Sequence, residues 1–144
     1  MAINKILVVC IGNICRSPAA EYLLRKKYPH LSISSAGISA PIMREAHPWM
    51  VAALRTLDID ASHHRSRLLT RQLILDADLI LVMEQKHREP ILRIDPSAAS
   101  KLFLFGFFFN EEVPDPINKE TFVFENCFER LQRYANSWDR HLKP

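Results

Sequence analysis

A segment near the start of the chain combines side chains suited to binding and cleaving a phosphate ester: Cys10-Ile11-Gly12-Asn13-Ile14-Cys15-Arg16-Ser17-Pro18. Cys10 supplies a thiol, and Arg16 supplies a planar guanidinium that can hold two phosphate oxygens at once. Gly12 and Asn13 tolerate positive φ, so the backbone can curl there. A helix N-terminus and a nearby cation lower a thiol pKa from about 8.5 to roughly 3.5–7.5. The segment therefore predicts an anion-binding loop with a thiolate at its floor.

Other interpretations of this segment compete with the phosphate loop. A nucleotide-binding P-loop needs Gly-Lys followed by Ser or Thr, and a dinucleotide fingerprint needs three spaced glycines; the segment has neither. The simplest alternative is a buried strand cysteine before an ordinary helix, because most free cysteines simply pack. The residue types and their spacing favour the phosphate loop. We therefore assign substrate binding to Ile11, Gly12, Asn13, Ile14, Cys15 and Ser17.

The hydrophobic pattern predicts the elements that hold this loop. Four short apolar runs read as strands, at residues 6–10, 31–35, 79–82 and 101–105. Five helical patterns follow, one starting near Ser17 and the others at residues 48–57, 70–76, 84–94 and 124–142. This alternation predicts an α/β fold, a small doubly wound four-stranded parallel sheet with helices on both faces. Ligands of such sheets bind beyond the C-terminal strand ends, and Cys10 stands at one of them.

Length and composition limit the class of protein. The chain of 144 residues suits a single domain, 1–144, and its net charge of +3 is too weak to indicate nucleic-acid binding. The apolar run at residues 6–11 is far too short to insert in a membrane. Three cysteines, an odd number, argue against a secreted disulfide scaffold and favour the cytoplasm. We expect a monomer or weak dimer.

The loop motif also resembles a known family. Cys-x5-Arg-Ser near an N-terminus is similar to the signature of the low-molecular-weight protein tyrosine phosphatases. The resemblance continues at Ser35-Ala36-Gly37, at His64-Arg65-Ser66-Arg67, at residues 79–84, at Leu104-Phe105-Gly106 and at Val113-Pro114-Asp115-Pro116. It therefore spans essentially the whole chain. The pattern is most similar to the bacterial members paired with tyrosine autokinases of polysaccharide export.

The resemblance implies hydrolysis of phosphotyrosine through a cysteinyl-phosphate intermediate. It makes Cys10 the nucleophile, Arg16 the phosphate clamp and Asp115 the general acid, since expelling a tyrosinate at neutral pH needs a proton donor. Asp-Pro is more often a plain turn, which is what we expect of Asp95-Pro96. The family's acid occupies the Asp-Pro at position 115. The implied partner is a phosphotyrosine protein, namely a bacterial tyrosine kinase controlling exopolysaccharide or capsule export.

The supporting residues are also implied by the resemblance. Ser17 would hydrogen-bond the thiolate, and Asn13, Ser35 and His64 would form a polar network that holds the loop. Without the family, these residues read equally well as a capping serine, turn residues or a surface histidine. Neither a cofactor nor a metal is expected. The pair His63-His64 lacks a third ligand at suitable spacing.

Three features depart from the family pattern or stand out. Ile117 follows the Asp-Pro where many members carry an aromatic residue. The loop after Gly37 carries Ile38, Ile42 and Met43, where others often place an aromatic. Three phenylalanines at 107–109 cannot all point inward from a strand, so one or two are expected at the surface, as part of a partner-binding area.

Two other functions and one redox role remain open. A thioredoxin-coupled arsenate reductase resembles this fold and loop, but it needs two closely spaced downstream cysteines, and here only Cys127 follows the loop. A non-catalytic phosphotyrosine-binding module is expected to lack the nucleophile or the acid, and both are present. Cys15 is either a small buried hydrophobe or a thiol that traps oxidised Cys10 as a disulfide.

Overall fold

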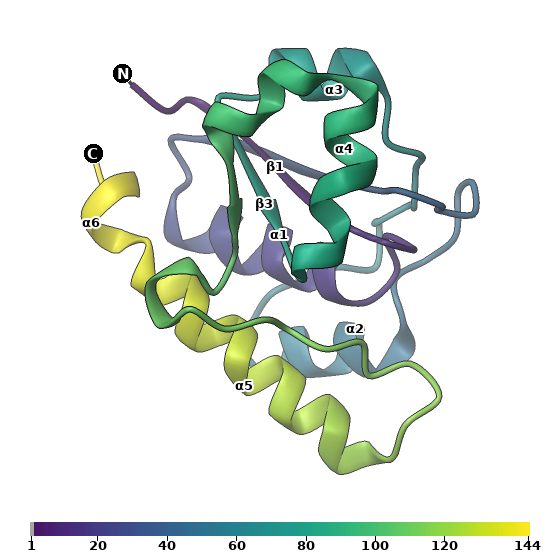
Figure 1. The fold of residues 1–144 in the computed structure, drawn as a ribbon. Helices are drawn as coiled ribbons and strands as arrows, with labels where there is room; N and C mark the ends of the chain where they lie inside the picture. Colours follow the sequence, from purple (N-terminus) through teal and green to yellow (C-terminus); the bar gives the residue numbers. More distant parts are fainter. Residues whose placement is uncertain (1) are drawn as a thin grey trace.

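A central sheet of four parallel strands organises the computed structural model, which describes residues 2–144 (Figure 1). The strands are β1 (Lys5–Cys10), β2 (Ser32–Gly37), β3 (Leu79–Val82) and β4 (Leu102–Leu104). Their order is β2-β1-β3-β4, so β2 and β4 form the edges. All pairings are parallel, and the last residue of β1 pairs with the last residue of β2. The predicted α/β sheet is confirmed.

Helices cover both faces of the sheet (Figure 1). They are α1 (Arg16–Lys27), α2 (Pro48–Arg55), α3 (Arg71–Asp76), α4 (Arg88–Ile94), α5 (Thr121–Ser137) and α6 (Asp139–Leu142), with the 3-10 helices η1 (Gln85–His87), η2 (Pro96–Lys101) and η3 (Phe107–Phe109). Alternate residues of β1 point into the two hydrophobic cores, one on each face of the sheet. Ile6 and Val8 pack with α1, α2 and α5, whereas Leu7 and Val9 pack with α3 and α4. Because β1 is buried on both faces, its sequence is continuously apolar.

Three predicted elements differ in detail. The helix expected at residues 124–142 is divided at Trp138 into α5 and α6, and the Trp138 indole Nε1–H donates to the Phe105 carbonyl at 2.9 Å. The helix expected at 84–94 is divided into η1 and α4. Asp95-Pro96, expected as a plain turn, starts η2, and the Asp95 carboxylate accepts the Ser97 N–H at 3.0 Å. The apolar residues predicted to face the core from the last helix are nevertheless buried.

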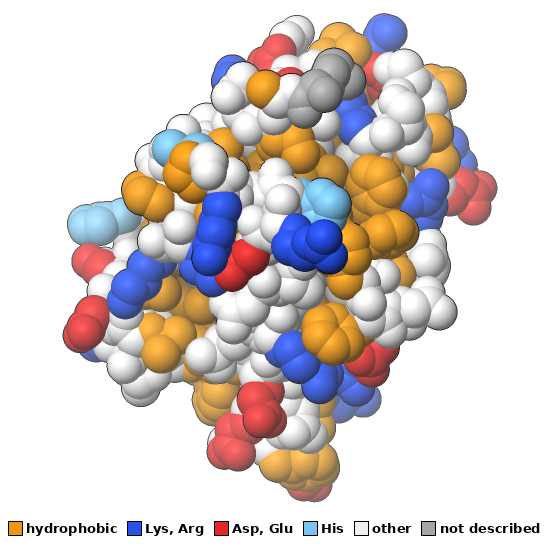
Figure 2. All heavy atoms as spheres, turned by 90° about the vertical axis from the view of Figure 1, so that its left-hand side faces the viewer, with side chains coloured by type: hydrophobic (Ala, Val, Ile, Leu, Met, Phe, Trp, Pro, Cys, Tyr) orange, Lys and Arg blue, Asp and Glu red, His pale blue; other side chains and the backbone are white. Residues whose placement is uncertain are grey.

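An aromatic group gathers where η3 meets the C-terminal helices. Phe107, Phe108 and Phe109 are each 44–48% exposed, so all three lie at the surface where one or two were expected. Phe108 stacks on His141, with ring planes 6° apart, and also contacts Trp138. Figure 2 views the side of the molecule that carries α6, where hydrophobic side chains lie among basic ones. Within residues 2–144, no helix is long and apolar enough to cross a membrane.

Candidate active site

The segment between β1 and α1 forms a loop whose carbonyl oxygens are turned outward. Four of them accept hydrogen bonds from neighbouring segments: Cys10 from Ile38 N–H (3.0 Å), Ile11 from Ser39 N–H (2.9 Å), Asn13 from the His64 ring (2.9 Å) and Ile14 from His47 N–H (2.8 Å). Within residues 2–144, no protein acceptor is present for the amides of Gly12, Ile14 and Cys15. The loop therefore has free N–H donors for an anion, at the N-terminus of α1.

The tight curl of the loop depends on Asn13 and Gly37. Asn13 has φ of 55°, in the left-handed region, whereas Gly12 does not use positive φ, contrary to the expectation for that glycine. Gly37 ends β2 directly against the loop. A Cβ at Gly37 would lie 2.6 Å from the Ile11 carbonyl oxygen and 2.9 Å from the Asn13 nitrogen. Only glycine allows this approach, a requirement that the sequence analysis did not recognise.

The Cys10 thiol lies at the floor of the loop. It is 3% exposed and receives the Asn13 backbone N–H at 3.3 Å. Ser17 Oγ lies 2.9 Å from the sulfur, on the first turn of α1. The Asn13 N–H, the Ser17 hydroxyl and the N-terminus of α1 therefore converge on one sulfur. The residues predicted to face Cys10 are therefore in contact with it.

A buried hydrogen-bond chain fixes which serine protons are available. Asn13 Nδ2 donates to Ser17 Oγ and to Ser35 Oγ, both at 2.9 Å, while its Oδ1 accepts the Arg67 backbone N–H at 3.0 Å. Ser35 then donates to Glu21 at 2.5 Å. Because both serines accept a proton from Asn13, the Ser17 hydroxyl is free to donate to Cys10. The expected network of Asn13, Ser35 and His64 is present, and Glu21 and Arg67 extend it.

Arg16 is buried and held by one edge of its guanidinium. Nη1 donates to Glu84 at 2.5 Å and to the Val113 carbonyl at 2.8 Å. Burial lowers the pKa of Arg16, but the charges of Cys10, Glu84 and Asp115 outweigh it and raise that pKa above its ordinary value. Glu84 follows the end of β3, the edge where ligands of parallel sheets bind. That position could have identified Glu84, yet the sequence analysis assigned it no role.

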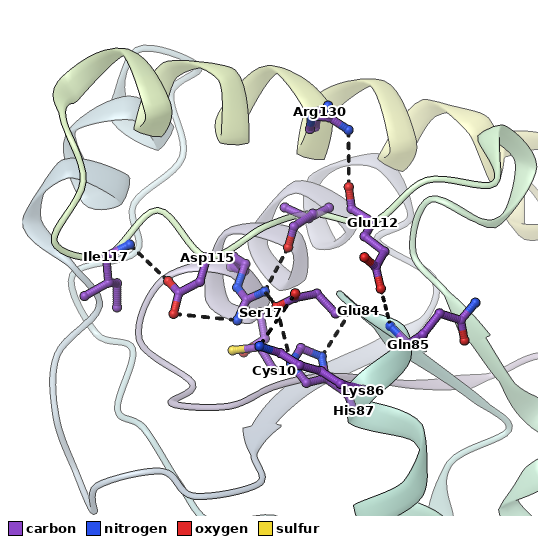
Figure 3. A network of polar contacts seen from close by, with 12 residues as sticks. Cys10, Ser17, Glu84, Gln85, Lys86, His87, Glu112, Asp115, Ile117 and Arg130 are labelled. Atoms are coloured by element: carbon purple, nitrogen blue, oxygen red, sulfur yellow. Dashed lines mark hydrogen bonds and ion pairs between the residues drawn. The ribbon is translucent and has the colours of Figure 1, made fainter.

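Asp115 reaches the site on a loop tied to its surroundings. The Val113 N–H donates to the Met83 carbonyl at 2.8 Å, and Glu112 accepts the Gln85 N–H at 2.6 Å. Asp115 Oδ1 accepts the Ile117 N–H at 3.0 Å, and Oδ2 lies 3.9 Å from Arg16 Nη2. Figure 3 shows Asp115 and Glu84 approaching the centre near Cys10 from two different elements. The predicted acid is thus placed beside the predicted clamp, with its side chain 47% exposed.

His87 lies behind Glu84 and is fully buried. Its Nδ1 accepts the Glu84 N–H at 3.1 Å, so the neutral ring carries its proton on Nε2, 3.7 Å from Glu84 Oε1. Within residues 2–144, Nε2 has no hydrogen-bond partner. Burial and the nearby Arg16 charge lower the pKa of His87 from 6.5 to about 4, which keeps the ring neutral at physiological pH.

The other two thiols have apolar surroundings. Cys15 is 3% exposed and belongs to the same core cluster as Cys127. Burial is the main cause that raises the pKa of Cys15 well above its usual range, and it raises that of Cys127 to about 12. All three cysteines are free. Cys15 thus contributes a backbone N–H to the loop, while its side chain packs.

The remaining predicted residues differ in exposure. Ile11 is 37% exposed, whereas Ile42 and Met43 are 78% and 65% exposed. Ile117 is partly buried against the core cluster. In the described part of the chain, residues 2–144, no three His, Cys, Asp or Glu side chains are grouped to hold a metal ion.

Comparisons with known proteins extend over nearly the whole chain. A family model described as low molecular weight phosphotyrosine protein phosphatase matches residues 5–144. The low molecular weight protein-tyrosine-phosphatase Wzb of Salmonella typhi is 40% identical over 140 residues, covering 96% of this chain and 94% of that protein.

Solved structures share the fold closely. The tyrosine phosphatase AmsI of Erwinia amylovora superposes with a TM-score of 0.94 at 39% identity, covering 99% of this chain and 95% of AmsI. Wzb of Vibrio vulnificus, solved in complex with benzylphosphonate, superposes with a TM-score of 0.93 at 36% identity, covering 98% and 100% of the two chains. The YwlE arginine phosphatase of Geobacillus stearothermophilus is also similar, with a TM-score of 0.89 and 30% identity over 97% of this chain and 93% of YwlE. Relatives of this fold therefore include enzymes named for two different phosphorylated residues.

Proposed function

Because the chain belongs to the low molecular weight phosphotyrosine protein phosphatase family and is a protein-tyrosine-phosphatase, we propose a catalytic role for each residue of its site. One observation carries the proposal. The Cys10 sulfur has an N–H donor at 3.3 Å and the Ser17 hydroxyl at 2.9 Å, at the floor of a loop with unengaged amides. A thiolate supported in this way can act as a nucleophile toward a phosphate held by those amides.

In the first step Cys10 attacks phosphorus in line with the tyrosine oxygen. The sulfur–phosphorus bond forms while the phosphorus–oxygen bond breaks, and Asp115 gives its proton to the departing oxygen. The arrangement supports this role, because Asp115 Oδ1 is engaged by the Ile117 N–H and Oδ2 remains to carry the proton. Protonation avoids the release of a tyrosinate anion at neutral pH.

In the second step water hydrolyses the cysteinyl phosphate. Asp115, now ionised, accepts a proton from the water as its oxygen attacks phosphorus. The sulfur–phosphorus bond breaks, the thiolate leaves, and inorganic phosphate is released. The Ser17 hydroxyl stabilises the leaving sulfur, because Asn13 already donates to its oxygen and leaves the hydroxyl proton free.

Arg16 provides the clamp through the edge of its guanidinium opposite Nη1. Nη1 is engaged by Glu84 and the Val113 carbonyl, which leaves Nη2 and Nε for two phosphate oxygens. This orientation supports bidentate binding of the equatorial oxygens, together with the loop amides. Arg16 and these amides supply the positive charge that the transferring phosphoryl group requires, so the proposed reaction needs neither a cofactor nor a metal.

Phosphoarginine is the second candidate substrate, because an arginine phosphatase shares the fold at 30% identity. Its leaving group is a guanidinium, which would favour carboxylates at the mouth of the loop in addition to the general acid Asp115. The exposed side chain of Ile11 and the partly buried Ile117 offer apolar surface instead. An aromatic ring gains more from such surface than a guanidinium does, which favours phosphotyrosine.

Turnover of matched peptides tests this function. Peptides of one sequence carrying phosphotyrosine or phosphoarginine would be assayed for phosphate release with EDTA present. We expect release from phosphotyrosine, release from phosphoarginine at least about tenfold slower, and no effect of EDTA. Equal or faster release from phosphoarginine would refute the substrate assignment, and loss of activity in EDTA would refute the metal-free mechanism.

We propose that the physiological substrate is a phosphorylated tyrosine autokinase of exopolysaccharide or capsule export. The similarity of the motifs to the bacterial members paired with such kinases supports this partner. Three free cysteines suit a cytoplasmic enzyme, in which residues 1–144 act as one domain, as a monomer or weak dimer.

Substrate trapping would test the kinase partner. Asp115→Ala retains the loop but slows leaving-group departure, so it should retain phosphorylated kinase on an affinity column. A kinase variant without its tyrosine phosphorylation sites serves as the control. Equal retention of both kinase forms would show that phosphotyrosine is not what the enzyme recognises.

A further inference from the structure

A basic hollow lies on the side of the loop-supporting network away from Cys10. It has a volume of about 270 Å³ and is lined by Glu21, Tyr22, Arg25, Ser34, Ser35, His63, His64, Arg65 and Arg67. Its three arginines outnumber the single carboxylate, that of Glu21. The catalytic mechanism uses none of these arginines.

Two of these arginines are fixed at the edge of the sheet. β2 is an edge strand, so alternate carbonyl groups along it have no partner strand. Arg25 Nε donates to the Ile33 carbonyl at 3.0 Å, and Arg67 Nε donates to the Ser35 carbonyl at 2.9 Å. Both guanidinium groups are therefore anchored through Nε, to carbonyls two residues apart along one strand, a spacing of about 6.6 Å. Arg25 Nε also pairs with Glu21 Oε2 at 3.2 Å, so Arg67 is the arginine of the two whose charge has no carboxylate partner within residues 2–144.

Anchoring through Nε leaves the outer edges of both guanidinium groups available. No hydrogen bond to a group within residues 2–144 is made by the Nη atoms of Arg25 or Arg67. Arg65 differs, because its Nη1 donates to the His64 carbonyl at 2.7 Å. Two oriented forks with free N–H groups match the oxygens of a tetrahedral dianion, and pre-orientation reduces the entropy lost on binding.

The hollow and the active site share parts of one hydrogen-bond network. Ser35 lines the hollow, and its hydroxyl accepts from Asn13 Nδ2 at 2.9 Å. The Arg67 backbone N–H donates to Asn13 Oδ1 at 3.0 Å. Asn13 in turn contacts the Cys10 sulfur. An anion in the hollow would therefore lie directly behind the catalytic loop, separated from Cys10 by this network.

We propose that the hollow is a second binding site for a phosphate dianion, with Arg25 and Arg67 as its principal ligands. The dianion is either free inorganic phosphate or a second phosphate ester on a multiply phosphorylated substrate. The competing explanation is that both arginines only cap the edge carbonyls of β2, which would block pairing with another strand.

Binding of inorganic phosphate to Arg16→Ala tests the proposal. This substitution removes the clamp of the catalytic loop but not its amides, so the hollow is reported by the difference between the hollow variants and the control variants below. Isothermal titration at low ionic strength should find one site in Arg16→Ala. Adding Arg25→Gln and Arg67→Gln should weaken binding about tenfold or more. The matched control adds Arg71→Gln and Arg93→Gln, which remove the same charge from α3 and α4, and should bind as Arg16→Ala does.

The folding of each variant is checked in the same experiment. Thermal unfolding by circular dichroism verifies that each variant folds. If the Arg25/Arg67 variant does not fold, Arg65→Gln in the Arg16→Ala protein replaces it, with a smaller expected loss of about threefold from its charge alone. Absence of phosphate binding in Arg16→Ala, or equal binding by the hollow and control variants, overturns the proposal.

Peptides then distinguish the two sources. Using Cys10→Ser, a peptide with two phosphotyrosines is compared with its singly phosphorylated form. Tighter binding of the doubly phosphorylated peptide that is lost with Arg25→Gln and Arg67→Gln assigns the hollow to a second ester. Equal binding of both peptides, with phosphate binding retained in Arg16→Ala, assigns it to the free anion.

Discussion

Cys10 and Cys15 lie five residues apart in one loop, are both 3% exposed and belong to one core cluster, and yet they differ in the polar groups at their sulfurs. Cys10 receives the Asn13 N–H and lies beside the Ser17 hydroxyl. Cys15 packs in the apolar core with Cys127, and burial raises its pKa. Burial alone therefore does not decide whether a thiol is reactive. In the proposed mechanism the nucleophile is the thiol whose sulfur hydrogen-bond donors reach, and those donors come from the curled loop and the first turn of α1.

The largest expected effect is the difference in kcat between the Cys10→Ser and Cys15→Ala variants. Cys10→Ser should lower kcat by a factor on the order of 10⁴–10⁶, because an alcohol does not ionise at this site as a thiol does. Cys15→Ala should keep kcat within about twofold, since its thiol has no step in the reaction. Steady-state kinetics on a phosphotyrosine peptide measures both. A tenth of wild-type activity in Cys10→Ser would remove Cys10 from the mechanism.

Asp115→Ala should have the next largest effect, and its size should depend on the leaving group. Loss of a positioned acid costs about 10²–10⁴-fold for phosphotyrosine. The loss should shrink for aryl phosphates whose phenols are acidic enough to depart without a proton. A leaving-group series of kcat values measures this dependence. An equal loss across the series would assign Asp115 to binding or folding.

His87 is a third buried titratable side chain, and its effect is on the free energy of unfolding rather than on the reaction. Its pKa falls from 6.5 in the unfolded chain to about 4 in the folded protein, so the unfolded state binds the extra proton between these values. The contribution of neutral His87 to the free energy of unfolding is fully present above pH 6.5. It is lost as pH falls toward 4, a change of about 3 kcal/mol.

Urea denaturation at pH 7 and pH 5 measures the part of this loss that falls in the interval, about 2 kcal/mol. His87→Asn should make stability nearly constant across this window. Asp78 and Asp139, whose pKa values are lowered by hydrogen bonds, lose their contribution only below pH 3.8 and do not interfere. An unchanged pH dependence in His87→Asn would mean that another group titrates.

Cys15→Ala should have the smallest effect on activity before oxidation, and its effect should appear only after exposure to peroxide. Mild peroxide converts a reactive thiolate to a sulfenic acid, which a neighbouring thiol can trap as a disulfide. Wild-type protein should form a Cys10–Cys15 disulfide, visible by mass spectrometry, and recover in dithiothreitol. Cys15→Ala should become irreversibly inactive at the same dose. Full recovery of the variant would leave Cys15 as a packing residue only.

The sequence predicted the features that depend on local pattern. The continuous apolar run of β1 and the helical spacing in the last helices identified the parallel sheet and the core faces. The loop residues were identified by type and spacing, and the position of Asp115 required the family resemblance. The break at Trp138 was not predicted, because the apolar spacing continues through it; the same residue also makes a contact that the local pattern does not encode, with the Phe105 carbonyl 33 residues away.

The missed site residues share one property, which is that their roles come from tertiary contacts. Glu84 acts on Arg16 across 68 residues, and Gly37 is required only because β2 ends against the loop. Arg67 was part of a motif of the family resemblance but was assigned no role, and its backbone N–H donates to the Asn13 amide oxygen. Such roles depend on which strands become neighbours, and local spacing does not encode that.

The most direct test of the account is to isolate the covalent intermediate. Cys10 should carry a phosphoryl group during turnover of a phosphotyrosine peptide, because its sulfur is the atom that attacks phosphorus. Asp115→Ala, mixed with an aryl phosphate whose phenol departs readily, should accumulate this species, since the water step then lacks its base. Rapid quenching followed by mass spectrometry of the peptide containing residues 10–16 should find one added phosphoryl group on Cys10 and none on Cys15. A peptide that stays unmodified while phosphate is released in that experiment would contradict the cysteinyl-phosphate mechanism.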